Sequence, residues 1–140
     1  MKAESITGEK PEVSAIVPTI GRPESLARLL DSLVSQTIRP DEVLVADGST
    51  GDAISQVVTD PRWGSSGLVV KRIRVQPPNA VRQRKAAIDL SQGNCLLLLD
   101  DDVELESDCI EQMLSTLKSA PDIVGVAADF NNQSLSLIHI

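Results

Sequence analysis

Aromatic residues are almost absent from this chain: its 140 residues include one tryptophan, one phenylalanine and no tyrosine. Basic residues are outnumbered too, because 13 lysines and arginines stand against 20 aspartates and glutamates, which gives a net charge of −7. Proteins that bind nucleic acids depend on basic surfaces and on aromatic rings that stack on bases. We therefore expect no nucleic acid among the partners of this protein.

Cysteine and histidine are equally scarce. Two cysteines, Cys95 and Cys109, and the single His139 are too few for a zinc site. His139 is also the penultimate residue, which argues against Ser-His-Asp and Cys-His catalysis. Two unpaired thiols are typical of a reducing compartment. We predict a cytoplasmic protein, with the inner face of the membrane as the alternative location of a longer form.

Long hydrophobic runs are missing as well. The longest, residues 95–99, is far shorter than the roughly 20 residues that a membrane-spanning helix needs. Residues 1–12 are polar and contain no apolar core of the kind found in a signal peptide. The sequence therefore predicts no membrane span in this chain.

The composition is that of a globular domain, with 41% hydrophobic and 24% charged residues. A chain of this length is expected to form one domain. We predict a flexible lead over residues 1–12, a folded domain over 13–130 and an unrelated tail over 131–140. Residues 134–140 resemble translated adapter sequence, and we expect the native protein to continue beyond about Gln133.

Short apolar runs of strand length alternate with segments of helical periodicity. The runs predicted as strands are residues 13–17, 42–46, 68–75, 95–99 and 123–128. Helices are predicted from Pro23, over 52–59, over 81–91 and from Asp108. This alternation predicts an α/β fold with a doubly wound, mainly parallel sheet and helices on both faces. We expect run 68–75 near the sheet edge and the four-leucine run 95–99 at its centre, buried on both faces.

Polar residues follow three of the predicted strands, at the sheet edge where open α/β folds bind their ligands. Asp100, Asp101 and Asp102 come directly after the most apolar run. In a strand-like extension Asp100 and Asp102 point the same way, so both carboxylates reach one cation. A divalent cation held by one or two carboxylates and a phosphate offsets their repulsion. The alternative is a solvated acidic turn that caps the next helix.

For the other polar positions a purely structural role is an alternative to a functional one. Asp47 precedes Gly48, and this pair is common in turns. Arg82, Arg84 and Lys85 begin a predicted helix and cannot share one face, because Arg82 and Lys85 are neighbours while Arg84 lies round the helix. They form either a solvated surface or a group that pairs with a ligand phosphate or with the aspartates.

Taken in order, these segments resemble the nucleotide-binding half of a family 2 glycosyltransferase of the GT-A fold, a Rossmann-like architecture. The stretches that carry the resemblance are VSAIVPT (13–19), RPESLARLLDSLVSQT (22–37), PDEVLVADGST (40–50) and LLLLDDDVEL (96–105). The second and third are specific in combination, whereas three aspartates alone are not.

The resemblance implies a nucleotide site and a metal site. Pro18, Thr19, Asp47, Arg84 and Asp101 match positions that bind the nucleotide, with Asp47 expected at the base and Asp101 near the ribose. Ile20 and Gly21 depart from the aromatic residue and asparagine usual in the family.

Asp100 and Asp102 match the ends of the DXD motif, which holds Mg²⁺ or Mn²⁺ in the family, and Asp102 is expected to be the direct ligand. The implied activity is transfer of a sugar, with inversion, from a nucleotide-diphosphate sugar, with UDP the most common nucleotide, to a hydroxyl of a saccharide or lipid acceptor. The resemblance places the catalytic base beyond residue 140, so this chain is expected to bind nucleotide without transferring sugar.

Two alternatives remain at this point. One is a non-catalytic nucleotide-binding module of the same fold. The other is a phosphotransfer domain of the haloacid dehalogenase type, which also places Asp-x-Asp after an apolar strand. That family has its motif after the first strand and usually follows it with glycine, whereas here the motif follows the fourth strand and precedes Val103.

Overall fold

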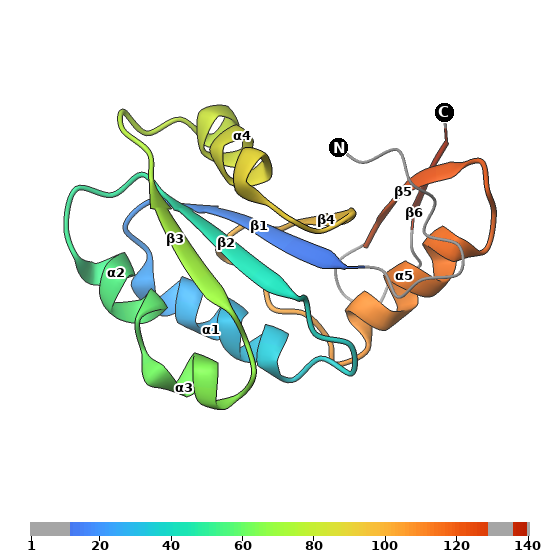
Figure 1. The fold of residues 1–140 in the computed structure, drawn as a ribbon, viewed down its shortest axis with the longest axis horizontal. Helices are drawn as coiled ribbons and strands as arrows, with labels where there is room; N and C mark the ends of the chain where they lie inside the picture. The colour runs from blue at the N-terminus through green and yellow to red at the C-terminus, as the bar shows by residue number, and fades with distance from the viewer. Residues whose placement is uncertain (1–11, 129–135, 140) are drawn as a thin grey trace.

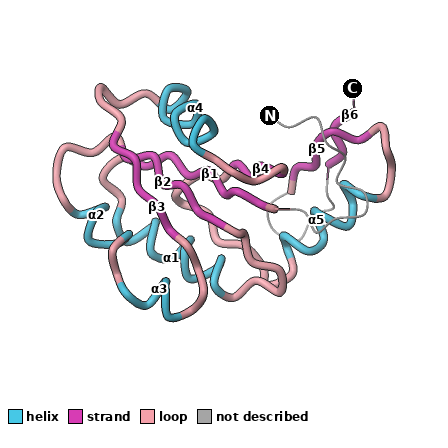
Figure 2. The backbone as a smooth tube through the Cα atoms, viewed as in Figure 1, coloured by secondary structure: helices cyan, strands magenta, loops and turns pink. Residues whose placement is uncertain are grey.

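The computed structural model describes residues 12–128 and 136–139 of the chain. Within them, strands and helices alternate along the backbone (Figure 2). Four strands form a parallel sheet in the order β3-β2-β1-β4 (Figure 1). These strands are β1 (Val13–Thr19), β2 (Glu42–Asp47), β3 (Val70–Arg74) and β4 (Cys95–Leu98). The predicted parallel α/β fold is confirmed.

Helices cover both faces of the sheet, as the sequence predicts. Three of them lie against one face (Figure 1): α1 (Pro23–Val34), α2 (Ala53–Val58) and α3 (Pro61–Ser65). On the opposite face α4 (Ala80–Leu90) packs across β1 and β2. The helix α5 (Cys109–Lys118) follows β4, and its Ile110 and Leu114 join the core on the side of α1. None of the described helices is long and apolar enough to cross a membrane.

Burial on both faces explains the near-continuous apolar character of β1 and β2. Ala15 and Val17 of β1 contribute to the core under α1, while Ile16 contributes to the smaller core under α4. Four leucines of α1, three or four residues apart, form its buried face: Leu26, Leu29, Leu30 and Leu33. Pro23 occupies the first turn of this helix, where its missing N–H costs nothing.

The expected central position of the leucine run is wrong. Among the described strands, β4 lies at the end of the four-stranded sheet, beside β1, and α4 covers β1 and β2 instead of β4. The side chains of β4 therefore alternate: Cys95 and Leu97 are buried, whereas Leu96 and Leu98 are 36% and 56% exposed. The basic strand β3 occupies the other edge, where the sequence places it.

The run predicted at 123–128 is a strand, β5 (Ile123–Ala127), outside the parallel sheet. It pairs in antiparallel fashion with β6 (Ser136–His139). The predicted flexible lead lies outside the described residues except for Glu12, and residues 131–135 and 140 of the predicted tail lie outside them too.

Candidate functional site

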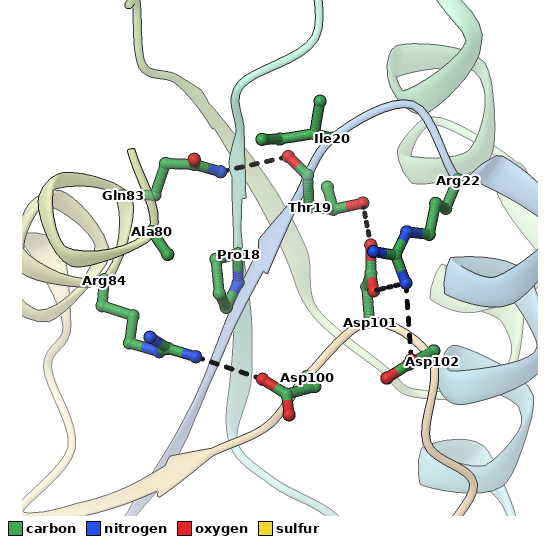
Figure 3. A pocket seen from close by; sticks show the side chains of 10 residues that line it. All are labelled: Pro18, Thr19, Ile20, Arg22, Ala80, Gln83, Arg84, Asp100, Asp101 and Asp102. Carbon is green, nitrogen blue, oxygen red and sulfur yellow. Dashed lines mark hydrogen bonds and ion pairs between the residues drawn. The ribbon is translucent and has the colours of Figure 1, made fainter. Parts of the chain in front are cut away.

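A cavity of about 290 Å³ opens at the carboxyl ends of β1 and β4, beside the first turn of α4 (Figure 3). Six of the residues singled out from the sequence line it: Pro18, Thr19, Arg84, Asp100, Asp101 and Asp102. They come from segments up to 84 positions apart, and the parallel sheet brings them together. Asp47 is not among the lining residues.

The three aspartates point in different directions (Figure 3). β4 ends at Leu98, and Asp101 and Asp102 already belong to a turn, so the expected strand-like extension is wrong. Asp100 accepts a hydrogen bond from Arg84 Nη2 at 3.1 Å, and Asp102 accepts one from Arg22 Nη1 at 3.4 Å. The carboxylates of Asp100 and Asp102 therefore turn toward different arginines.

Asp101 is the buried member of the three, with 6% of its surface exposed. Its Oδ2 accepts a hydrogen bond from the Thr19 hydroxyl at 2.8 Å, and its Oδ1 lies 3.5 Å from Arg22 Nη1. The Thr19 hydroxyl, itself buried, thus connects the carboxyl end of β1 to the aspartate turn. This contact holds the turn against the sheet.

Arg22 is a site residue that the sequence reasoning missed. It precedes α1 and lies within ion-pair distance of both Asp101 and Asp102. Its position in the sequence could have identified it, because Arg22 lies in the loop after β1, only three residues beyond Thr19. In a parallel sheet this loop lies beside the loop that follows the neighbouring strand β4.

A buried glutamine sets the direction of α4. Gln83 is 1% exposed, and its Nε2 donates to the backbone oxygens of Thr19 and Ala46, at the ends of β1 and β2. Asn79 begins the helix, and its side chain accepts a hydrogen bond from the Arg82 N–H. With Gln83 facing the sheet, the next residue, Arg84, reaches the cavity, while Arg82 is exposed. Of the basic group, only Arg84 lines the site.

Asp47 has no exposed surface. Its Oδ1 accepts the Ser49 N–H at 2.8 Å, and its Oδ2 accepts Arg72 Nε at 2.9 Å. Ser49 in turn accepts the N–H of Gly21 at 2.7 Å, and Gly21 has a φ of +61°, a conformation that favours glycine. Asp47 therefore organises the loops that follow β1 and β2.

The donor set of the cavity suits a hard divalent cation. Carboxylate oxygens are the ligands that Mg²⁺ and Mn²⁺ prefer, and the Asp100 and Asp102 side chains are 64% and 55% exposed. No group of three or more acidic, histidine or cysteine ligands is assembled among the described residues. A cation at this site would take its remaining ligands from a bound phosphate or from water.

The fold and this polar cavity define a class, that of α/β proteins whose ligand site lies at the carboxyl ends of parallel strands. Comparison with known proteins then identifies the family. The model of the family described as "Glycosyl transferase family 2" matches residues 14–139, and the chain belongs to this family.

Curated relatives are glycosyltransferases. A glucosyl-dolichyl phosphate glucuronosyltransferase of Haloferax volcanii is 27% identical over 82% of this chain and 37% of its own length. A GalNAc(5)-diNAcBac-PP-undecaprenol β-1,3-glucosyltransferase of Campylobacter jejuni is 26% identical over 74% of this chain and 34% of its own. The chain thus spans a little over a third of the length of these relatives.

Solved structures share the fold. Staphylococcus aureus TarS 1–349 in complex with UDP superposes with a TM-score of 0.65 at 23% identity, over 76% of this chain and 32% of TarS. The mannosyltransferase PcManGT of Pyrobaculum calidifontis, in complex with GDP-Man and Mn²⁺, gives a TM-score of 0.67 at 20% identity, over 83% of this chain and 34% of its own. Both structures are similar to this chain in their fold, the GT-A fold.

Proposed function

We propose that this chain is the donor-binding part of an inverting, metal-dependent glycosyltransferase that uses a nucleotide-diphosphate sugar. The observation that carries the proposal is the cavity at the strand ends, where Asp100, Asp101 and Asp102 meet two arginines in a family 2 chain. PcManGT, which shares the fold, is described with GDP-Man and Mn²⁺.

Charge balance supports the metal. Three carboxylates and two guanidinium groups line the cavity, so the site carries one net negative charge. A nucleoside diphosphate is itself an anion, and two anions repel each other in a partly desolvated site. When bound, Mg²⁺ or Mn²⁺ supplies a Lewis acid that stabilises charge on the departing diphosphate. Asp102 and Asp100 are the residues proposed to hold it, because their carboxylates are accessible.

The remaining lining residues bind and orient the nucleotide in this proposal. Arg84 reaches the cavity from α4 and presents a guanidinium suited to phosphate oxygens. Pro18 and Thr19 form the wall contributed by β1, and Asp101 completes it beside the proposed ribose position. Contact between Asp47 and the base requires Asp47 to exchange one of its present partners, because the side chain has no exposed surface.

Transfer also requires a base that removes the proton of the acceptor hydroxyl. We assign no carboxylate of the cavity to this step, because Asp100 and Asp102 are proposed to hold the metal and Asp101 is buried against the Thr19 hydroxyl. In the proposal the base lies beyond residue 140, so the chain alone binds the donor but does not transfer sugar to a saccharide or lipid acceptor. The two free cysteines support a cytoplasmic location.

A thermal-shift series with UDP, GDP and dTDP, each with and without Mn²⁺, tests the proposal. UDP is the proposed nucleotide, and GDP, the nucleotide moiety named for PcManGT, is the alternative candidate. A ligand at 100 times its Kd adds about 2.7 kcal/mol of stability, roughly 5–10 °C for a chain of this size. A shift with one nucleotide that needs Mn²⁺ is the expected result.

The matched variants are Asp102→Ala and Asp89→Ala. Asp102→Ala is expected to abolish the Mn²⁺-dependent shift, because it removes the proposed direct ligand. Asp89→Ala removes an equal charge from the surface of α4, where Asp89 pairs with Lys85, and is expected to retain the shift. An unchanged shift in Asp102→Ala would remove Asp102 as the ligand, and a folded wild type without any shift would contradict the proposed function.

A further inference from the structure

The two arginines of the cavity are engaged differently (Figure 3). Arg84 contacts one carboxylate, that of Asp100, at 3.1 Å. Arg22 instead places a single atom, Nη1, 3.5 Å from Asp101 Oδ1 and 3.4 Å from Asp102 Oδ2. One guanidinium therefore offsets two adjacent carboxylates, and one of them, that of Asp102, is the proposed direct ligand of the divalent cation.

The backbone of Arg22 is held on both sides, whereas more than half of its side chain is exposed. Gly21 is held by its hydrogen bond to Ser49, Pro23 begins α1, and the Arg22 carbonyl accepts the Leu26 N–H at 3.0 Å. The Arg22 side chain is 57% exposed, and both of its ion-pair distances are long for hydrogen bonds. Such contacts are weak and exchangeable, so the guanidinium can leave the aspartates without disturbing α1.

We propose that Arg22 is a built-in counter-cation that keeps free divalent metal off Asp102, the proposed direct ligand, and so makes metal binding depend on the nucleotide. This inference rests on the proposed function. Without nucleotide, a metal ion must displace Arg22, which then loses both of its anionic partners. With nucleotide, the diphosphate offers the guanidinium a new anionic partner, and phosphate is a group that arginine binds well.

The consequence is a thermodynamic coupling between two ligands. Nucleotide raises the affinity for metal, and by linkage metal raises the affinity for nucleotide by the same factor. Arg22 increases this factor because its contacts weaken metal binding only in the nucleotide-free protein. A residue that served only to hold α1 in place would leave the coupling unchanged.

The test measures Mn²⁺ binding to the full 140-residue chain by the electron paramagnetic resonance signal of free Mn²⁺, with and without saturating UDP or GDP. Arg22→Gln is expected to bind Mn²⁺ alone roughly three- to tenfold more tightly than wild type, the size of two weak ion pairs. The coupling factor is expected to fall. Arg22→Lys, which keeps the charge, is expected to retain weak binding of free Mn²⁺.

Arg28→Gln is the matched control, because Arg28 is an exposed arginine of α1, the helix that Arg22 precedes, and its guanidinium donates to Ser25. Its Mn²⁺ affinity is expected to equal that of wild type, and melting temperatures verify that every variant is folded. If wild type shows the coupling but Arg22→Gln binds free Mn²⁺ no more tightly than Arg28→Gln, the inference is overturned and the proposed function stands. Absence of Mn²⁺ binding to wild type with every nucleotide overturns both.

Discussion

The ion pair between Asp47 and Arg72 makes a sharp prediction about stability. The Asp47 carboxylate is completely buried and the Arg72 side chain is 23% exposed, with 2.9 Å between Oδ2 and Nε. Arg72→Met removes the cation and retains most of the aliphatic packing. The carboxylate then keeps the Ser49 N–H as its remaining hydrogen-bond donor.

The cost depends on which partner is removed. An uncompensated buried charge costs about 3–5 kcal/mol, and we expect about 3 kcal/mol for Arg72→Met because the site lies near the edge strand β3. Asp47→Asn leaves the cation unpaired instead, but water reaches the exposed part of Arg72. We expect about 1–2 kcal/mol for this variant. The double variant is expected to cost less than the sum of the two.

Urea denaturation at neutral pH measures all three variants as changes in the free energy of unfolding. Arg74→Met is the control, because Arg74 belongs to the same strand and donates to the backbone oxygen of Gly51, an exposed residue. We expect it to cost about 0.5 kcal/mol or less. An Arg72→Met cost no larger than that of Asp47→Asn, or a double variant that is simply additive, would refute the reasoning.

Two further predictions concern a carboxylate and a glycine. Burial raises the pKa of Glu42, but hydrogen bonds from Ser14, the Gln92 N–H and Lys71 outweigh it, so the pKa is lowered from 4.5. Wild type is therefore expected to be more stable than Glu42→Gln at neutral pH, and this difference is expected to disappear as the pH falls below about 4.5. Urea denaturation at several pH values measures the difference. A Cβ on Gly48 would lie 2.9 Å from Pro78 Cβ, whereas one on Gly51 meets nothing within 4 Å. Gly48→Ala is expected to cost about 1–3 kcal/mol of stability and so to lower the melting temperature. Gly51→Ala is expected to lower it less.

The periodicity of hydrophobic residues predicts the helices and strands of this fold, because it follows which side chains of each element are buried in the core. The leucines of α1 fall on one helical face and are all buried, and the apolar runs of β1 and β2 match strands covered on both sides. The edge position of β3 also follows from its sequence, since Lys71, Arg72 and Arg74 suit a strand with one open side.

The position of β4 is not predictable in this way. Four consecutive leucines indicate burial on both faces, yet Leu96 and Leu98 are exposed, because α4 packs on their face of the sheet but over β1 and β2. Strand order depends on contacts between segments distant in sequence, which local periodicity does not encode. The same limit applies to Asp100 and Asp102, because spacing along a strand predicts their direction only while the strand continues.

Register explains why Thr19 meets Asp101 although 82 positions separate them. Ile16 pairs with Leu98, the last residue of β4, so the turn that contains Asp101 begins beside the last residues of β1. In the β1–β2 ladder Thr19 pairs with Asp47. The polar groups after three strands therefore form one row across the sheet, with Thr19 in the middle. A slip of one residue between β1 and β4 would exchange the faces of every β4 side chain and break the Thr19–Asp101 contact. The candidate site is thus a consequence of the same pairing that buries Cys95 and Leu97.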